Sequence, residues 1–231
     1  MRMSIAIPCY EMNGLGVQFL NKCLDSISKQ SFKDIEVVVS DHSLNNNILE
    51  ACNTWNNFLK IKYIKNLDKR GSSSNNINNC IKNCSGELIK ILCQDDFLYE
   101  KDSIKKIIDN FKTGWLVSTY IHTYDTFIFV NKHTPVISNN ILTCNKIGTH
   151  SCLTIENNDV ILFDENLIWF MDSEYYKRLY NKYGKPVILD EITMVQTLWR
   201  GQVTNTLATE EVRINEYLYL KEKYGDKNEK W

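Results

Sequence analysis

The sequence lacks the features that mark membrane-spanning, secreted and nucleic-acid-binding proteins. Its 231 residues include 27 lysines and arginines against 28 aspartates and glutamates, so it has no basic excess to attract nucleic acid. Its apolar runs are all far shorter than the roughly 20 residues that cross a bilayer, and its first ten residues lack the apolar core of a secretory signal. We therefore expect a cytoplasmic protein with no integral membrane segment and no nucleic-acid partner.

Proline and glycine are also scarce, and the cysteines form no metal-binding pattern. Only 3 prolines and 9 glycines occur, which argues against long linkers and disorder. The 8 cysteines include no C-x-x-C pair and no Cys/His quartet at zinc spacing. We interpret them as reduced thiols of a single cytosolic domain.

The first hundred residues alternate strand and helix signals. Short apolar runs predict strands at residues 3–7, 35–39, 61–64 and 88–92. Apolar residues at helical spacing predict helices at 19–27 and again before Gly86. Parallel strands joined by helices predict a doubly wound α/β sheet whose ligands bind at the carboxyl ends of the strands.

The second half has a different character. Aromatic and β-branched runs predict strands at residues 115–120 and 126–130, and a short strand is expected at 187–189. Apolar spacing predicts helices at 102–111, 170–183 and 210–224.

Asp95 and Asp96 directly follow the fourth expected strand and are the sharpest local feature. Adjacent carboxylates repel each other, so a site that keeps both ionised usually supplies a cation. Oxygen ligands suit Mg²⁺ or Mn²⁺, which in turn hold a diphosphate. The alternative is that the pair only solvates a turn and caps the next helix.

Five motifs in register along about 90 residues resemble the family 2 glycosyltransferases of GT-A fold. They are residues 4–10, 23–32, 35–41, Gly71 with Asn78 and Gly86-Glu87, and 92–96. The resemblance implies one α/β GT-A domain over residues 1–231. Residues 1–112 would form a Rossmann-like nucleotide-sugar-binding half with a mostly parallel central sheet flanked by helices. Residues 113–231 would form a smaller acceptor-side half that ends in a helix.

The resemblance also assigns roles to individual residues of the first half. The positions that it implies for donor binding are Pro8, Tyr10, Asp41, Asn78 and Asp95, with Asp41 pairing with the base. Asp95, with Asp96 beside it, matches the metal-binding acids. The sequence departs from the family where Cys93 and Gln94 fill the first two places of "D-x-D-D", which puts metal affinity in doubt. A core aromatic at Tyr10 and a helix cap at Asp41 remain alternatives.

A weaker resemblance covers residues 162–179. It places Asp172 on the general base of inverting family members. An acceptor hydroxyl needs such a carboxylate because its own pKa is close to that of water. The alternative is that Asp172 only caps the helix that follows, and Met171 stands where the family has Glu.

The family's late metal-binding histidine is missing, because Trp199 stands at its position and no histidine follows His150. Arg200 is a candidate contact for the diphosphate, and His150 is a candidate contact for the acceptor. A surface role for Arg200 and a buried or turn role for His150 are the alternatives.

Together these residues predict an inverting, Mn²⁺- or Mg²⁺-dependent hexosyltransferase of polysaccharide biosynthesis. We expect it to move a sugar from a UDP-sugar to a hydroxyl of a glycan or other acceptor. One alternative is a sugar nucleotidyltransferase, although residues 9–16 lack the basic phosphate loop that such an enzyme needs. The other is a weakened transferase that only binds nucleotide or glycan, which Cys93, Gln94 and Trp199 favour.

Overall fold

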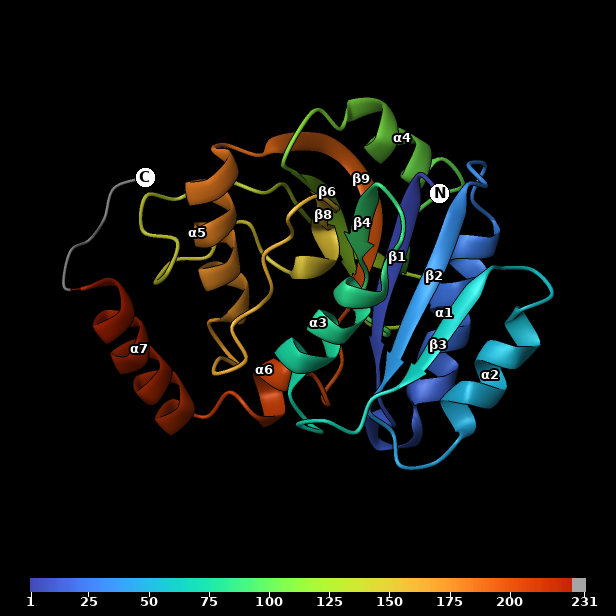
Figure 1. Ribbon diagram of the computed structural model, residues 1–231, viewed down its shortest axis with the longest axis horizontal. Helices are drawn as coiled ribbons and strands as arrows, with labels where there is room; N and C mark the ends of the chain where they lie inside the picture. The colour runs from blue at the N-terminus through green and yellow to red at the C-terminus, as the bar shows by residue number, and fades with distance from the viewer. Residues whose placement is uncertain (226–231) are drawn as a thin grey trace.

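The computed structural model describes residues 1–225, and nine strands in this range form one sheet (Figure 1). The strands are β1 (Met3–Cys9), β2 (Ile35–Asp41), β3 (Ile61–Lys65), β4 (Leu88–Ile91), β5 (Phe97–Leu98), β6 (Trp115–Thr123), β7 (Phe129–His133), β8 (Leu153–Glu156) and β9 (Val187–Thr197). The α-helices are α1 (Gly16–Ser28), α2 (Asn47–Trp55), α3 (Ser73–Asn83), α4 (Ser103–Asn110), α5 (Met171–Tyr183), α6 (Val203–Thr206) and α7 (Glu210–Tyr224). Two short 3₁₀ helices are η1 (Met12–Gly14) and η2 (His150–Cys152). The last six residues of the expected domain lie outside the described range.

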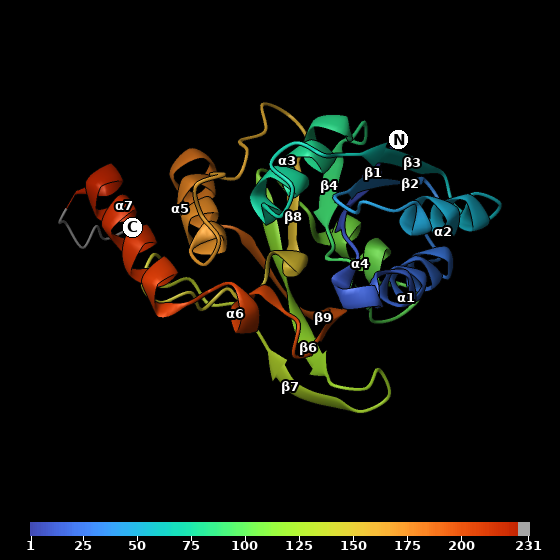
Figure 2. The same ribbon diagram turned by 90° about the horizontal axis from the view of Figure 1, so that it is seen from below.

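The amino-terminal half confirms the expected α/β arrangement. Strands β3, β2, β1 and β4 lie side by side in that order and are parallel. Every residue of β2 is buried, and the apolar run Val37–Val39 at its centre is typical of a strand covered on both faces. Helices α1 and α2 cover one face of these strands and α3 covers the other (Figure 2).

The carboxyl-terminal half makes the sheet as a whole mixed, whereas the amino-terminal half has the parallel strands that were expected of it. Strand β8 inserts between β4 and β6 and is antiparallel to both, while β6 and β9 are parallel. The sequence did not predict β8, because its four residues are too few to show a period. The strand predicted at residues 187–189 is only the beginning of β9, which continues through the charged pair Asp190-Glu191 to Thr197. Helix α2 was also missed, although Ile48, Cys52 and Trp55 recur in it at helical spacing.

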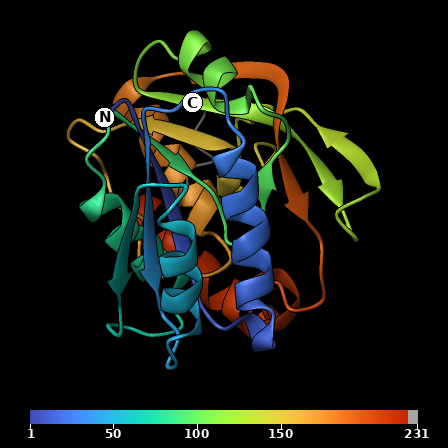
Figure 3. The same cartoon turned by 90° about the vertical axis from the view of Figure 1, so that its right-hand side faces the viewer.

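Strand β7 pairs with the carboxyl-terminal end of β6 in a hairpin, and it projects from the sheet (Figures 2 and 3). Strand β7 begins at Phe129 rather than at the expected residue 126. The reason is local, because the Asp125 carboxylate accepts hydrogen bonds from the backbone amides of Phe127 and Ile128 at 2.9 and 2.8 Å. These bonds fix a turn and delay the strand.

All eight cysteines are free thiols, and four of them, Cys9, Cys23, Cys52 and Cys80, are buried in the core of the amino-terminal half. In the second half, helix α5 packs on β6 by stacking Tyr176 on Trp115 at a centroid distance of 6.0 Å. Among residues 1–225, the helices are all too short or too polar to cross a membrane.

Candidate functional site

A cavity of about 690 Å³ lies at the carboxyl ends of the parallel strands. Pro8 and Tyr10 border it where β1 ends, His42 where β2 ends, and residues 93–96 where β4 ends. Residues 148–150 and 168–173, from the second half, border it as well. This is where a sheet of this kind is expected to bind its ligand.

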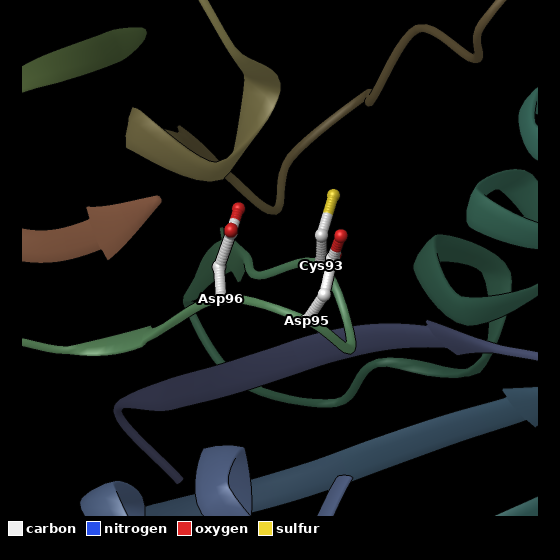
Figure 4. Close-up of side chains that lie close together, drawn as sticks. All are labelled: Cys93, Asp95 and Asp96. Carbon is white, nitrogen blue, oxygen red and sulfur yellow. The ribbon is translucent and has the colours of Figure 1, made fainter. Parts of the chain in front are cut away.

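Three side chains that can ligate a metal project in the same direction from the turn after β4 (Figure 4). One ligand atom each from Cys93, Asp95 and Asp96 lies within 4.8 Å of the others. Asp95 Oδ2 accepts a 2.8 Å hydrogen bond from the indole of Trp199, and Asp96 Oδ1 accepts one of 3.0 Å from the amide of Thr197. These neutral donors orient the two carboxylates without neutralising them.

Asp95 and Asp96 repel each other when both are ionised, and the hydrogen bonds around them do not offset this repulsion or the cost of burial. Burial raises the pKa of Asp95 above its usual value, although the Trp199 hydrogen bond opposes the change. Burial, followed by the charge of Asp95, raises the pKa of Asp96. A bound cation would favour the ionised form of both, so the donor set fits a divalent ion.

Gln94 stands at the variable second place of the "D-x-D-D" pattern, and its side chain connects the end of β1 to α1 at the edge of the cavity. Its side-chain oxygen accepts from the amide of Tyr10 at 2.9 Å, and its amide group donates to the carbonyl of Gly16 at 2.6 Å. A Cβ at Gly16 would lie only 2.4 Å from the Tyr10 carbonyl oxygen. Glycine at this position therefore permits the close approach of β1's end to α1.

A chain of three polar side chains crosses the cavity from one half to the other. Cys93 Sγ lies 3.0 Å from His150 Nε2, and His150 Nδ1 lies 2.7 Å from Asp172 Oδ1. Burial lowers the pKa of His150, but its contacts with Cys93 and Asp172 outweigh this effect and raise that pKa well above its usual value. His150 thus links the candidate metal site to the candidate base.

Buried hydrogen bonds hold η2, and with it His150, against β4. The fully buried Lys90 donates from its ammonium group to the carbonyl of Ser151. The Ser151 hydroxyl in turn accepts from the amide of Cys93 at 2.9 Å. Because Lys90 and Cys93 belong to the same stretch as the two acids, these bonds fix the two sides of the cavity relative to each other.

Six of the nine expected site residues border the cavity, namely Pro8, Tyr10, Asp95, Asp96, His150 and Asp172. Asp41 does not border it, because its buried carboxylate accepts from the Tyr63 hydroxyl at 2.7 Å and from Lys65 at 3.3 Å on β3. Asn78 does not border it either, and its side chain pairs with the backbone of Phe163 in both directions. Arg200 is exposed outside the cavity.

Glu11, His42 and Arg70 are among the other residues that border the cavity, and the sequence had not singled them out. Arg70 donates to both carboxylate oxygens of Glu11 at 3.0 and 3.1 Å and to the carbonyl of His42 at 2.7 Å. Arg70 thus places a positive charge on the side of the cavity that the amino-terminal half forms. The sequence offered no signal for it beyond its place in the loop before α3.

The family model described as "Glycosyl transferase family 2" matches residues 4–152. This range is more than half of the chain. The chain belongs to glycosyl transferase family 2. The match confirms the family that the motifs indicated, and it includes β1 to β4 and the turn that carries Asp95 and Asp96.

Two curated relatives match less of the chain. One is the GalNAc(5)-diNAcBac-PP-undecaprenol beta-1,3-glucosyltransferase of Campylobacter jejuni, 31% identical over 98 residues, which are 42% of this chain and 30% of the relative. The other is glycosyltransferase GlyA of Streptococcus pneumoniae, 28% identical over 112 residues, which are 47% of this chain and 15% of the relative. The matched region therefore spans less than a third of either relative.

Solved structures confirm the GT-A fold expected from the motifs. The chain is similar to S. aureus TarS 1-349 in complex with UDP-GlcNAc, with a TM-score of 0.73 and 18% identity over 95% of this chain and 65% of TarS. It is also similar to the mannosyltransferase PcManGT of Pyrobaculum calidifontis in complex with GDP-Man and Mn²⁺. There the TM-score is 0.62 with 15% identity, over 86% of this chain and 57% of the other.

Proposed function

We propose that the protein is an inverting, metal-dependent glycosyltransferase that moves a sugar from a UDP-sugar to a hydroxyl group of a glycan. The observation that carries this proposal is the position of two acidic groups at one cavity. Asp95 and Asp96 border it from the end of β4, and Asp172 borders it from the start of α5. This combination supplies a site for a leaving diphosphate and a base for the attacking hydroxyl. We further propose that the reaction belongs to polysaccharide assembly in the cytoplasm.

Cys93, Asp95 and Asp96 would hold the divalent cation. When bound, Mn²⁺ or Mg²⁺ supplies positive charge that stabilises the departing diphosphate. The three side chains already lie within ligating distance of one another. They keep that arrangement because Trp199, Thr197 and Ser151 hold the two carboxylates and the Cys93 backbone from the surrounding loops.

We assign the donor nucleoside to the side of the cavity that the amino-terminal half forms, beside Pro8, Tyr10 and His42. Arg70 borders the same side, and its guanidinium is a candidate partner for donor oxygens. Asp41 supports this side indirectly, since its Oδ1 accepts from the amide of Ser43 at 2.8 Å. That bond shapes the loop in which His42 sits.

Asp172 is assigned the role of general base. Its Oδ1 is held by His150 at 2.7 Å, so Oδ2 is the oxygen that would take the proton from the acceptor hydroxyl. The hydroxyl oxygen would then attack the anomeric carbon as the bond to the diphosphate breaks. Because attack and departure occur on opposite faces, the anomeric configuration is inverted.

A thermal-shift screen tests this proposal without knowledge of the acceptor. UDP-sugars and GDP-sugars are added singly, each with and without Mn²⁺, and a bound ligand raises the unfolding midpoint by mass action. We expect a UDP-sugar to raise the midpoint in the presence of Mn²⁺ and to raise it less without the ion. A protein that responds to none of these donors would contradict the proposal.

A further inference from the structure

Helix α7 lies beside α5 at one end of the molecule (Figure 1). Through Glu216 it contacts residues 168–170, which border the cavity. Glu216 on α7 is buried, and its carboxylate accepts three backbone hydrogen bonds. Oε1 accepts from Ile168 at 2.6 Å, and Oε2 accepts from Trp169 at 2.9 Å and from Phe170 at 3.0 Å. Successive amides that converge in this way form a concavity for an anion, and here the anion comes from the chain itself.

These bonds fix the backbone at the start of α5. Phe170 is the residue before the first turn of α5, and its own side chain makes no capping hydrogen bond. Glu216 therefore provides the negative charge that favours a helix amino terminus. Asp172 stands in the first turn that this contact holds.

A second contact from α7 fixes the Trp169 side chain. The Arg213 guanidinium lies 4.0 Å from the centre of the Trp169 ring, which is a cation–π contact. Trp169 borders the cavity and Arg213 does not, so the ring is held by a residue that is not itself part of the cavity lining. The backbone and the ring of Trp169 are thus held by two residues one turn apart on the same helix.

We propose that Trp169 forms a binding subsite for the acceptor sugar, with Glu216 and Arg213 as its positioning residues. A pyranose ring has a face of C–H groups that stacks on an indole, and a rigid aromatic ring offers this surface at low entropic cost. Trp169 lies three residues before Asp172, so a sugar on its ring is close to the proposed base. This inference rests on the proposed function for the identity of the sugar as acceptor.

The first test measures whether Glu216 holds residues 168–170, and it needs no substrate. Amide hydrogen exchange is measured by NMR in the full chain and in Glu216→Gln. Glutamine keeps one carbonyl oxygen but replaces the other acceptor with an N–H donor. We therefore expect exchange to become at least about tenfold faster either at Ile168 or at Trp169 and Phe170. Glu222→Gln, at an exposed position of the same helix, is the matched control and should leave exchange unchanged.

The second test measures sugar binding at the ring. Methyl glycosides of glucose, galactose and N-acetylglucosamine are titrated singly while the Trp169 indole resonance is followed. We expect at least one of them to shift this resonance, and we expect Arg213→Ala to weaken that binding about tenfold, equivalent to ~1.4 kcal/mol. Glu222→Gln should bind like the unsubstituted protein.

Unchanged amide exchange in Glu216→Gln would overturn the positioning role. An indole resonance that no glycoside moves would overturn the sugar subsite. Both readouts are independent of donor binding, which the thermal-shift screen measures. A protein that binds the glycosides at Trp169 but no nucleotide sugar would therefore contradict the proposed transferase and leave the sugar subsite standing.

Discussion

The indole Nε1 of Trp199 donates a 2.8 Å hydrogen bond to Oδ2 of Asp95, joining the loop after β9 to the turn after β4. The ring is enclosed, since it lies 5.2 Å from the ring of Phe19 and would clash with any Cβ at Gly201. Trp199, which the resemblance places at the position of the family's histidine, therefore contacts a candidate metal ligand through a neutral donor. It orients that ligand instead of adding another.

Replacing Trp199 with histidine is expected to add a ligand to the site. The imidazole nitrogen is a common metal ligand and would approach Asp95 from the same side. We expect Trp199→His to bind Mn²⁺ about tenfold more tightly in the presence of UDP, measured by isothermal titration calorimetry. Trp199→Phe loses the same hydrogen bond but offers no ligand. Equal Mn²⁺ affinity in the two variants would show that position 199 does not reach the ion.

Replacing Cys93 with aspartate is expected to change which cation the site prefers. Sulfur favours softer ions such as Cd²⁺ and Zn²⁺, whereas carboxylate oxygen favours Mg²⁺. We expect Cys93→Asp to tighten Mg²⁺ binding and to weaken Cd²⁺ binding, each about tenfold by calorimetry. Cys144→Ser, at a free cysteine that does not border the cavity, is the control. An unchanged ratio of the two affinities would exclude Cys93 as a ligand.

Asp172→Asn is expected to separate donor binding from transfer. The amide keeps the size of the side chain but is too weak a base to accept the acceptor proton. We expect the dissociation constant for the UDP-sugar to stay unchanged while kcat for transfer falls at least about a hundredfold. Asp159→Asn, at a surface acid paired with Lys182, should retain full activity. Transfer at the original rate in Asp172→Asn would mean that another group is the base.

Stability at low pH should depend on the contact between Asp164 and helix α7. Burial raises the pKa of Asp164, but hydrogen bonds from Lys223 and Tyr219 outweigh it and lower the pKa to about 2. The unfolded value is about 3.9, so this stabilisation is present above that pH and is lost as the pH falls toward 2. A shift of this size corresponds to roughly 2 to 3 kcal/mol.

Urea unfolding measured between pH 6 and pH 2.5 tests the contribution of Asp164. We expect Asp164→Asn to be less stable than the original protein at pH 6, and we expect the difference to shrink as the pH approaches 2.5. Asp109→Asn, at an exposed acid on α4, should show little difference at any pH. A difference for Asp164→Asn that stays constant with pH would contradict the assigned ionisation.

The parts of the fold that the sequence predicted are those set by local pattern. Strands β1, β2 and β4 are rich in apolar residues because helices bury both of their faces, and the turn with Asp95 and Asp96 follows from where β4 ends. Strand β8 has no such pattern, because its place between β4 and β6 depends on pairing with residues far away in the sequence.

The site itself could be predicted only in part, for the same reason. Motif positions identified Asp95 and Asp172, which border one cavity. They did not show that the Asp41 carboxylate turns toward Tyr63, since the direction of a side chain at a strand end depends on the neighbouring strand. Contacts between residues distant in the sequence, such as Cys93 with His150 and Ile168 with Glu216, have no local signature.

Calorimetric titration of UDP into the original protein and into Asp95→Asn, each with and without Mn²⁺, tests the central claim most directly. If the acids after β4 hold a cation that binds the diphosphate, Mn²⁺ will tighten UDP binding by at least about tenfold in the original protein and will have no effect in the variant. Equal enhancement by Mn²⁺ in both proteins, or none in either, would contradict the account.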